Sequence, residues 1–364
     1  MTIPASNKGF SLVRLIGRIT PGSRGPLFGP SIVPRRAAAD IPRDVHDAIA
    51  IRLDSVLRGL DRDRRAHTAR IDRMLQQSVG GAALAGLVLG WIAWGSLLIG
   101  LAVMVIAALF ALLVLFAKAE KGPRAATRTG ILAAVAEQLS DLTVDPAPDI
   151  PREWFAQLKL MQRVRKVIVD LRLTGQREGR IVGVSRIGLM FGEDRNYKED
   201  HDKGLTFVMV QIDLPETAGQ QDVTVILPKD MGWNIKDAPK VFHGLTERPT
   251  GDEGFDARYT SYGDANRLTP ALRRSFAELE RPARSAQHAM AEVEPGTGMR
   301  PWVSILPGQL VVLTPIPKFD GAFEPPPYWQ PLDPEDLIPA FAADLAVLET
   351  YLNAALHLAK GVTP

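Results

Sequence analysis

The sequence predicts an α+β protein in which a two-helix transmembrane hairpin precedes a cytoplasmic, mostly antiparallel β-sheet domain with flanking helices. Three observations support this prediction. Residues 74–117 contain no charged residue and no histidine. Several runs rich in β-branched and aromatic residues follow after residue 180, and amphipathic helical patterns flank those runs.

The charge-free run is too long for a single membrane span. As one helix, residues 79–117 would extend about 58 Å at 1.5 Å per residue, about twice the hydrocarbon core of a bilayer. We therefore predict two helices, 79–94 and 97–117, joined by a turn at Trp94-Gly95-Ser96. Ala82, Gly86 and Gly90 recur at four-residue spacing, which allows close contact either with the second helix or with a second copy of the chain.

Basic residues flank the run on both sides and predict its orientation. They are Arg58, Arg62, Arg64, Arg65, Arg70 and Arg73 before it, and Lys118, Lys121, Arg124 and Arg128 after it. Because positive charge concentrates on the cytoplasmic side of membranes, we expect a multi-pass protein with both termini in the cytoplasm. Besides the lipid bilayer itself, anionic lipid is the partner expected at these basic flanks.

Around the hairpin the chain divides into further segments. Residues 1–42 are rich in Pro, Gly, Ser and Arg and predict a disordered cationic tail, although a short basic amphipathic turn within it could lie on anionic lipid. We expect a juxtamembrane helix at 43–78 and a stalk helix at 118–144. The DPAPDIP sequence at 145–151 marks a boundary, after which a cytoplasmic α+β domain at 150–333 and a C-terminal helix at 334–361 follow.

Within the α+β domain, apolar residues at helical spacing predict an amphipathic helix at 152–172. Strands are expected at 180–191, 204–214, 222–228, 254–262, 302–306 and 310–316. Pro307-Gly308 joins the last two strands, and we expect a longer or bulged loop there because tight hairpins prefer other turn types. Thr269-Pro270 opens a helix whose Leu272, Phe276 and Leu279 face the core.

The composition limits the chemistry. The chain has no cysteine, which excludes disulfides and thiolate sites, and its net charge of +2 argues against a nucleic-acid binder. No phosphate-binding loop, dinucleotide glycine pattern, nucleophile elbow or paired-histidine zinc motif occurs. We therefore name no catalytic, cofactor-binding or metal-binding residue and expect no cofactor.

Two polar clusters remain as weak candidates. Residues 193–202 combine carboxylates with His201, which could hold a divalent cation, but the interleaved Arg195 and Lys198 favour a solvated hairpin loop. Asp256, Tyr259, Tyr262 and Asp264 precede the capped helix, where such residues usually satisfy backbone groups.

The second half of the chain resembles a known family. The segments that carry the resemblance occur in this order: GLTFVMVQIDL, DVTVILP, FDARYTSYGDANRLTPALRRSFAELE, WVSILPGQLVVLTPIP, FEPPPYW and DLAVLETYLNAAL. Together with the upstream hairpin, they resemble the bacterial membrane-protein family known as domain of unknown function 3137, over roughly residues 70–358. The cationic tail and the insert at 280–299 depart from the family pattern. The resemblance implies an inner-membrane protein with a cytoplasmic α+β domain, no established activity and a role in the cell envelope.

These observations favour a membrane-anchored binding or scaffold module that acts on a protein partner or on a second copy of itself, rather than an enzyme. The alternative is a membrane-surface hydrolase or transferase that uses carboxylates such as Asp200, Asp202 or Asp256. A channel is disfavoured because no charged residue lies within the spans.

Overall fold

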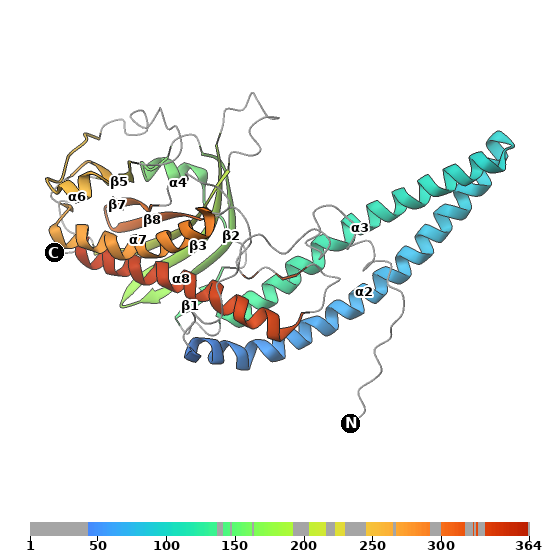
Figure 1. The fold of residues 1–364 in the computed structure, drawn as a ribbon, viewed down its shortest axis with the longest axis horizontal. Coiled ribbons are helices and arrows are strands. Elements are labelled where there is room, and N and C mark those ends of the chain that lie inside the picture. Colours follow the sequence, from blue (N-terminus) through green and yellow to red (C-terminus); the bar gives the residue numbers. More distant parts are fainter. Residues whose placement is uncertain are drawn as a thin grey trace. The chain divides into compact units, whose positions relative to one another are not determined.

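The computed structural model describes residues 43–136, 141–145, 148–161, 164–191, 204–215, 223–229, 245–264, 267–291, 300–316, 323, 325–326 and 332–362 (Figure 1). The predicted tail at 1–42 and the polar cluster at 193–202 lie outside these residues. The chain forms two compact units. Unit 1 is built around Asp47–Ala134 and Phe323–Ile338, and unit 2 around Val135–Ala322 and Pro339–Pro364.

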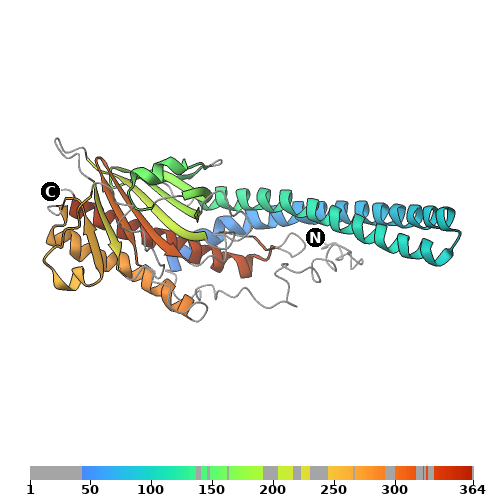
Figure 2. The same cartoon turned by 90° about the horizontal axis from the view of Figure 1, so that it is seen from above.

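Unit 1 contains a long antiparallel helical hairpin. Helix α2 (Arg43–Trp94) and helix α3 (Leu97–Ala136) lie side by side up to the turn that joins them (Figure 1 and Figure 2). Gly95 ends α2 in the left-handed region at φ +61°, and its N–H donates to the Trp91 carbonyl at 2.8 Å. The turn therefore lies at the predicted position, and α2 runs without a break through the predicted juxtamembrane helix.

Apolar composition distinguishes one stretch of this hairpin. Among the described residues, the Leu53–Ala93 part of α2 is long and apolar enough to cross a membrane, and α3 contains a shorter apolar stretch, Leu98–Phe110.

Glycines set the contact between the two helices near the turn. A Cβ atom at Gly90 would lie 2.6 Å from the Gly100 Cα atom, and one at Gly86 would lie 2.9 Å from the Met104 Cα atom. Backbones can approach this closely only where side chains are missing. Of the two alternatives for these glycines, the structure shows contact within the same hairpin.

Further from the turn, larger apolar residues pack the hairpin. Leu53, Leu57 and Ile71 of α2 are buried, as are Ile131 and Leu132 of α3. The predicted stalk helix at 118–144 is too long, since α3 ends at Ala136 and Leu142–Val144 form strand β1 instead. β1 forms because its three residues pair with a neighbouring strand, which no local pattern shows.

Unit 2 contains an eight-stranded sheet in the order β1-β2-β3-β4-β8-β7-β5-β6. After β1, its strands are β2 (Val164–Arg177), β3 (Arg180–Phe191), β4 (Gly204–Asp213), β5 (Thr224–Pro228), β6 (Tyr259–Tyr262), β7 (Trp302–Leu306) and β8 (Gln309–Ile316). Every neighbouring pair is antiparallel, which confirms the predicted α+β class and sheet type.

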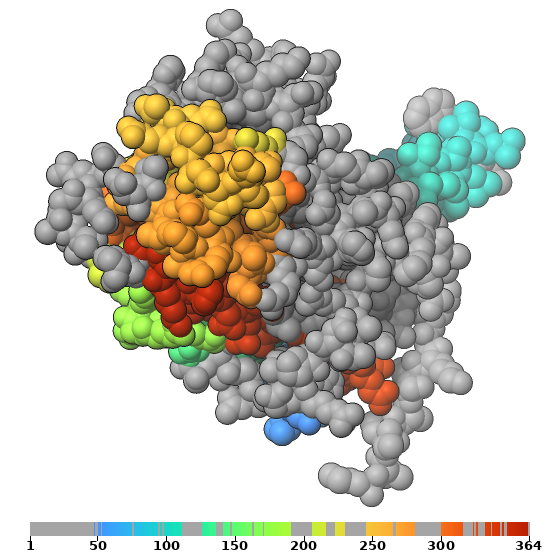
Figure 3. All heavy atoms as spheres, turned by 60° about the vertical axis from the view of Figure 1, so that its left-hand side comes forward, coloured from blue at the N-terminus to red at the C-terminus, as the bar shows by residue number. Residues whose placement is uncertain are grey.

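Helices cover both faces of this sheet. The first face, which carries Phe207 and Leu313, packs against α4 (Arg152–Gln157) and the residues after it. The second face carries Tyr259, whose ring packs on Phe276 of α7 (Pro270–Ala291) at 5.1 Å between centroids. Helix α8 (Pro334–Val362) begins in unit 1, and within unit 2 its part after Ile338 lies beside α7 (Figure 3).

Helices α7 and α8 follow their predictions. The Leu272 N–H donates to the Thr269 Oγ1 atom at 3.1 Å, so Thr269 caps α7 as expected. The predicted core residues of α7 are buried. So are the apolar positions predicted for the final helix, namely Phe341, Leu345, Leu348, Leu352 and Leu356.

The predicted helix at 152–172 is wrong beyond its first turn. Helix α4 ends at Gln157, and β2 begins at Val164 and pairs with β3 along almost its whole length. The apolar spacing suited a helix, but Val164, Val167, Ile168 and Val169 are β-branched and their partners lie in the next strand. Tertiary pairing therefore outweighs the local period.

Two smaller predictions also need correction. Residues 254–262 are not one strand, because Asp252 caps a single helical turn, α6 (Glu253–Asp256), before β6 begins. The β7–β8 connection is a tight two-residue turn, since Leu306 pairs directly with Gln309. Gly308 has φ +71°, which suits the third position of a type II turn with Pro307 before it.

Candidate functional site

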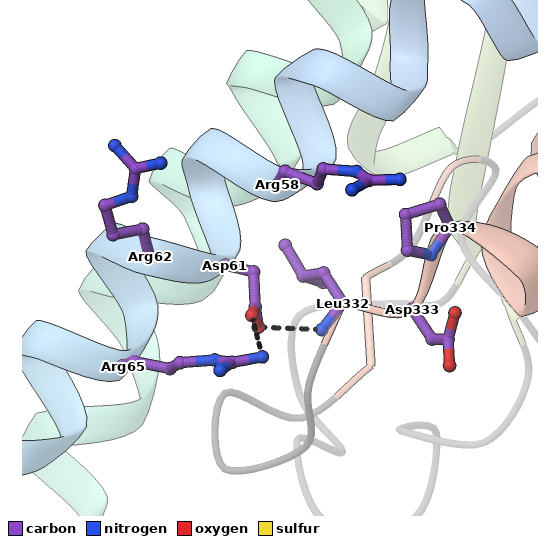
Figure 4. A pocket seen from close by; sticks show the side chains of 7 residues that line it. All are labelled: Arg58, Asp61, Arg62, Arg65, Leu332, Asp333 and Pro334. Carbon is purple, nitrogen blue, oxygen red and sulfur yellow. Dashed lines mark hydrogen bonds and ion pairs between the residues drawn. The ribbon is translucent and has the colours of Figure 1, made fainter. Parts of the chain in front are cut away.

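A groove of about 430 Å³ lies in unit 1, between one face of α2 and the residues that open α8 (Figure 4). Its lining is mostly charged and consists of Arg58, Asp61, Arg62, Arg65, Leu332, Asp333 and Pro334. Its arginines, Arg58, Arg62 and Arg65, were predicted to flank a membrane span. Their position next to the start of α8 was not predicted.

Asp61 forms the centre of this groove. It is buried, and its Oδ1 atom accepts the backbone N–H of Leu332 at 3.0 Å. Its Oδ2 atom pairs with the Nη2 atom of Arg65, one turn further along α2, at 2.6 Å (Figure 4). The Asp61 carboxylate therefore joins two segments of the chain and has a charged partner on its own helix.

Arg64 makes a second link of the same kind. Its side chain is buried, and its Nη2 atom donates to the Pro326 carbonyl at 3.0 Å. We call Asp61 and Arg64, together with the Leu332 amide and the Pro326 carbonyl, the polar clamp. Within unit 1 this clamp holds Pro326 and Leu332 on α2.

The other charges of the groove also have partners or lie at its rim. The Nε atom of Arg58 donates to Asp54 at 3.0 Å in an exposed pair. Asp333 caps α8 by accepting the Glu335 N–H at 3.0 Å. Arg62 is exposed, and its side chain points away from Leu332 (Figure 4). The residues that line the groove therefore suit a contact between two segments of the chain. They do not include a nucleophile next to a general base.

Unit 2 has its own buried charge cluster. Glu280 is almost fully buried and accepts two hydrogen bonds from Arg258, at 2.7 and 2.8 Å, and one from the Tyr259 hydroxyl at 2.9 Å. Burial, followed by the Glu280 charge, raises the pKa of Tyr259 far above its usual range. The Tyr259 hydroxyl therefore keeps its proton at neutral pH, and its bond to Glu280 links β6 to α7.

The polar edge predicted before α7 is also structural. Asp256 accepts the Thr250 N–H at 3.0 Å, the Thr250 hydroxyl at 2.8 Å and the Gly251 N–H at 3.0 Å. Burial alone would raise the pKa of Asp256, but these hydrogen bonds outweigh it and lower that pKa. Tyr262 is partly buried and packs against the core of the first face, and this burial raises its pKa. At Asp264, the backbone carbonyl accepts the Thr224 hydroxyl at 3.2 Å.

Of the three carboxylates suggested for an enzyme, only Asp256 lies in the described part of the chain. Asp256 stabilises its own loop, while Asp200 and Asp202 lie outside the described residues. Among the residues that the structure describes, no group of three His, Asp or Glu side chains is arranged to hold a metal ion.

Sequence analysis missed the polar clamp, although one signal was present. Among the described residues of α2 before its charge-free part, the buried positions follow a three- and four-residue spacing: Leu53, Leu57, Asp61, Arg64, Thr68 and Ile71. A charged residue within an apolar stripe is buried and needs a partner. Asp61 and Arg64 were therefore identifiable as paired residues, although their partners were not.

Comparison with known proteins adds no further constraint: no protein-family model, curated protein or solved structure matches this chain. The resemblance to domain of unknown function 3137 therefore stays a prediction from the quoted segments.

Proposed function

We propose that this chain is a membrane-anchored binding or scaffold protein of the bacterial envelope. In this proposal the α2–α3 hairpin inserts into the inner membrane with both termini in the cytoplasm. The α+β unit is the cytoplasmic part and binds a protein partner or a second copy of the chain.

The observation that carries the proposal is the apolar surface of the hairpin. Large apolar side chains are exposed all along both helices near the turn, namely Leu84, Val88, Leu89, Trp91, Ile92, Leu98, Ile99, Leu101, Val105, Ile106, Leu109 and Phe110. A monomeric protein in water rarely exposes such a continuous apolar patch. Lipid acyl chains would cover this surface, and the helical backbone satisfies its own hydrogen bonds.

The lengths of the helices support two crossings. The stretch of α2 from Met74 to Trp94 and that of α3 from Leu97 to Ala117 would each extend about 31 Å, close to the roughly 30 Å of a hydrocarbon core. Neither stretch contains a charged residue. Gly95 would then lie at the opposite membrane surface, with Trp91 near the headgroups.

The same geometry refines the expected contact with anionic lipid. Arg70 and Arg73 lie within about 6 Å of Met74 along the helix axis, whereas Arg58 lies about 24 Å away. Lipid headgroups would therefore meet Arg70 and Arg73, and the groove at Arg58 and Asp61 would lie below them.

Topology can be tested with single cysteines, because the chain has none of its own. We expect a membrane-impermeant maleimide to label Gly95→Cys in intact cells, and a cysteine appended after Pro364 to react only after lysis. Labelling of the appended cysteine in intact cells would contradict the proposed orientation. Cross-linking in native membranes, followed by mass spectrometry, would identify the partner, and a strictly monomeric protein without cross-links would argue against a scaffold.

A further inference from the structure

We propose that the polar clamp is a releasable attachment that holds the start of α8 on α2. It can open and close without disrupting the hairpin itself. This inference concerns unit 1 alone and does not rest on membrane insertion, so its test and the topology test can fail independently.

The choice of residues at the clamp is the first argument. The buried stripe of α2 contains Leu53, Leu57 and Ile71, so leucine or isoleucine would suit positions 61 and 64. Replacing buried charges by well-packed apolar residues is often neutral or stabilising. Asp61 and Arg64 direct their charges at backbone groups of Leu332 and Pro326 instead, which gives a directional contact rather than a stronger one.

The second argument is that Asp61 keeps a partner when the clamp opens. Its Oδ2 atom pairs with Arg65 at 2.6 Å, and the Arg65 side chain is 68% exposed. Loss of the hydrogen bond to the Leu332 amide would therefore leave a carboxylate that is still paired. An unpaired buried charge would cost much more free energy, and that cost usually keeps such contacts closed. The groove beside Asp61 gives water a route to the vacated oxygen.

The third argument is the position of the clamp in the chain. Leu332 is followed at once by Asp333, which caps α8, and by Pro334 at the first helical position. Opening at Leu332 would thus free the cap and first turn of α8, where the Leu337 N–H donates to the Asp333 carbonyl at 3.0 Å. The clamp therefore controls whether α8 begins on α2.

Hydrogen exchange measured by mass spectrometry on the full chain in mild detergent tests this. We expect Asp61→Leu, which removes the acceptor of the Leu332 N–H, to speed exchange of the amides at 332–338 about tenfold or more while exchange in α2 stays unchanged. Asp54→Leu is the matched control, because Asp54 lies two turns earlier on the same helix and pairs only with exposed Arg58 among the contacts described. This control should leave exchange at 332–338 as in the wild type.

Arg64→Met keeps a side chain of similar size without the charge and provides a second, independent variant. If the clamp opens as one unit, the double variant should exchange no more than about twofold faster than the faster single variant. If the effects of the two variants multiply, the clamp does not open as one unit. Unchanged exchange at 332–338 in Asp61→Leu would also overturn the proposal. Faster exchange throughout α2 would also overturn it, because the pair would then be part of the hairpin fold.

Discussion

Asp141 shows how a single ionic contact joins distant parts of unit 2. Arg177, at the end of β2, donates to both Asp141 oxygens and to Glu349 of α8 at 3.2 Å. The hydrogen bond from Arg177 lowers the pKa of Asp141, and burial only partly opposes it. The same bond raises the pKa of Arg177. The ionised pair is therefore favoured in the folded state.

The depressed pKa of Asp141 predicts a loss of stability in acid. Because the unfolded chain binds the proton more tightly, the contribution of Asp141 is fully present above about pH 4 and disappears as the pH falls through the lower folded value. Since Asp141 is partly exposed, solvent screening limits the effect to about 1 kcal/mol.

We therefore expect wild type to exceed Asp141→Asn in free energy of unfolding at pH 6, and the difference to shrink steadily as the pH falls below about 4, measured by urea unfolding of the full chain in detergent. Asp213→Asn, which removes an exposed carboxylate of β4, should run parallel to wild type over the same pH range. A constant gap between wild type and Asp141→Asn across this range would contradict the prediction.

Among the elements, those with local signals were the ones predicted well. Thr269-Pro270 marks the start of α7, and Gly95 interrupts an apolar run. The strands after residue 180 are bounded by turn residues. The segment after Gln157 has no such signal, since its apolar spacing fits a helix and its β-branched residues fit a strand. Pairing with β3 decides between them, and that partner lies outside the segment.

The candidate site was harder to predict for the same reason. Asp61 and Leu332 are 271 positions apart, so no local pattern relates them. The arginines around Asp61 are visible in the sequence as positive charge next to an apolar run. Charge alone predicts contact with lipid as readily as contact with another segment of the chain. The Asp61–Arg65 pair has the four-residue spacing that a helix brings together, but only the fold shows that the Leu332 amide meets Asp61 and the Pro326 carbonyl meets Arg64.

At the scale of elements, the close approach of α2 and α3 at Gly90 predicts that a larger residue there destabilises the hairpin. Gly90→Ala would place a Cβ atom 2.6 Å from the Gly100 Cα atom, so the helices must separate. We expect a loss of about 1–3 kcal/mol, which exceeds the gain of up to about 1 kcal/mol in helix propensity.

Gly81→Ala is the matched control for this prediction, because nothing lies within 4 Å of its added Cβ atom. It should be neutral or slightly stabilising. Thermal unfolding in detergent, followed by circular dichroism, would measure both variants. Equal midpoints for the two would show that the close contact at Gly90 is not needed.

For the molecule as a whole, the surroundings of the hairpin decide how much free energy a charged substitution on its surface costs. If the hairpin lies in lipid, an arginine near the middle of α3 meets hydrocarbon, and if it lies in water the same change is nearly neutral. Ile106 suits this test because it is 66% exposed and lies close to the centre of the charge-free part of α3. Ile51, which is 79% exposed on α2 and precedes that region, is its control.

We expect Ile106→Arg to cost about 2.5–3.5 kcal/mol of membrane insertion, whereas Ile51→Arg should stay within about 0.5 kcal/mol of wild type. The measurement is the fraction of chain that resists alkaline carbonate extraction from membranes. That fraction should fall sharply for Ile106→Arg and remain at the wild-type level for Ile51→Arg. If both variants partition as wild type does, the exposed apolar surface of α3 does not face lipid, and a protein partner in solution must cover it instead.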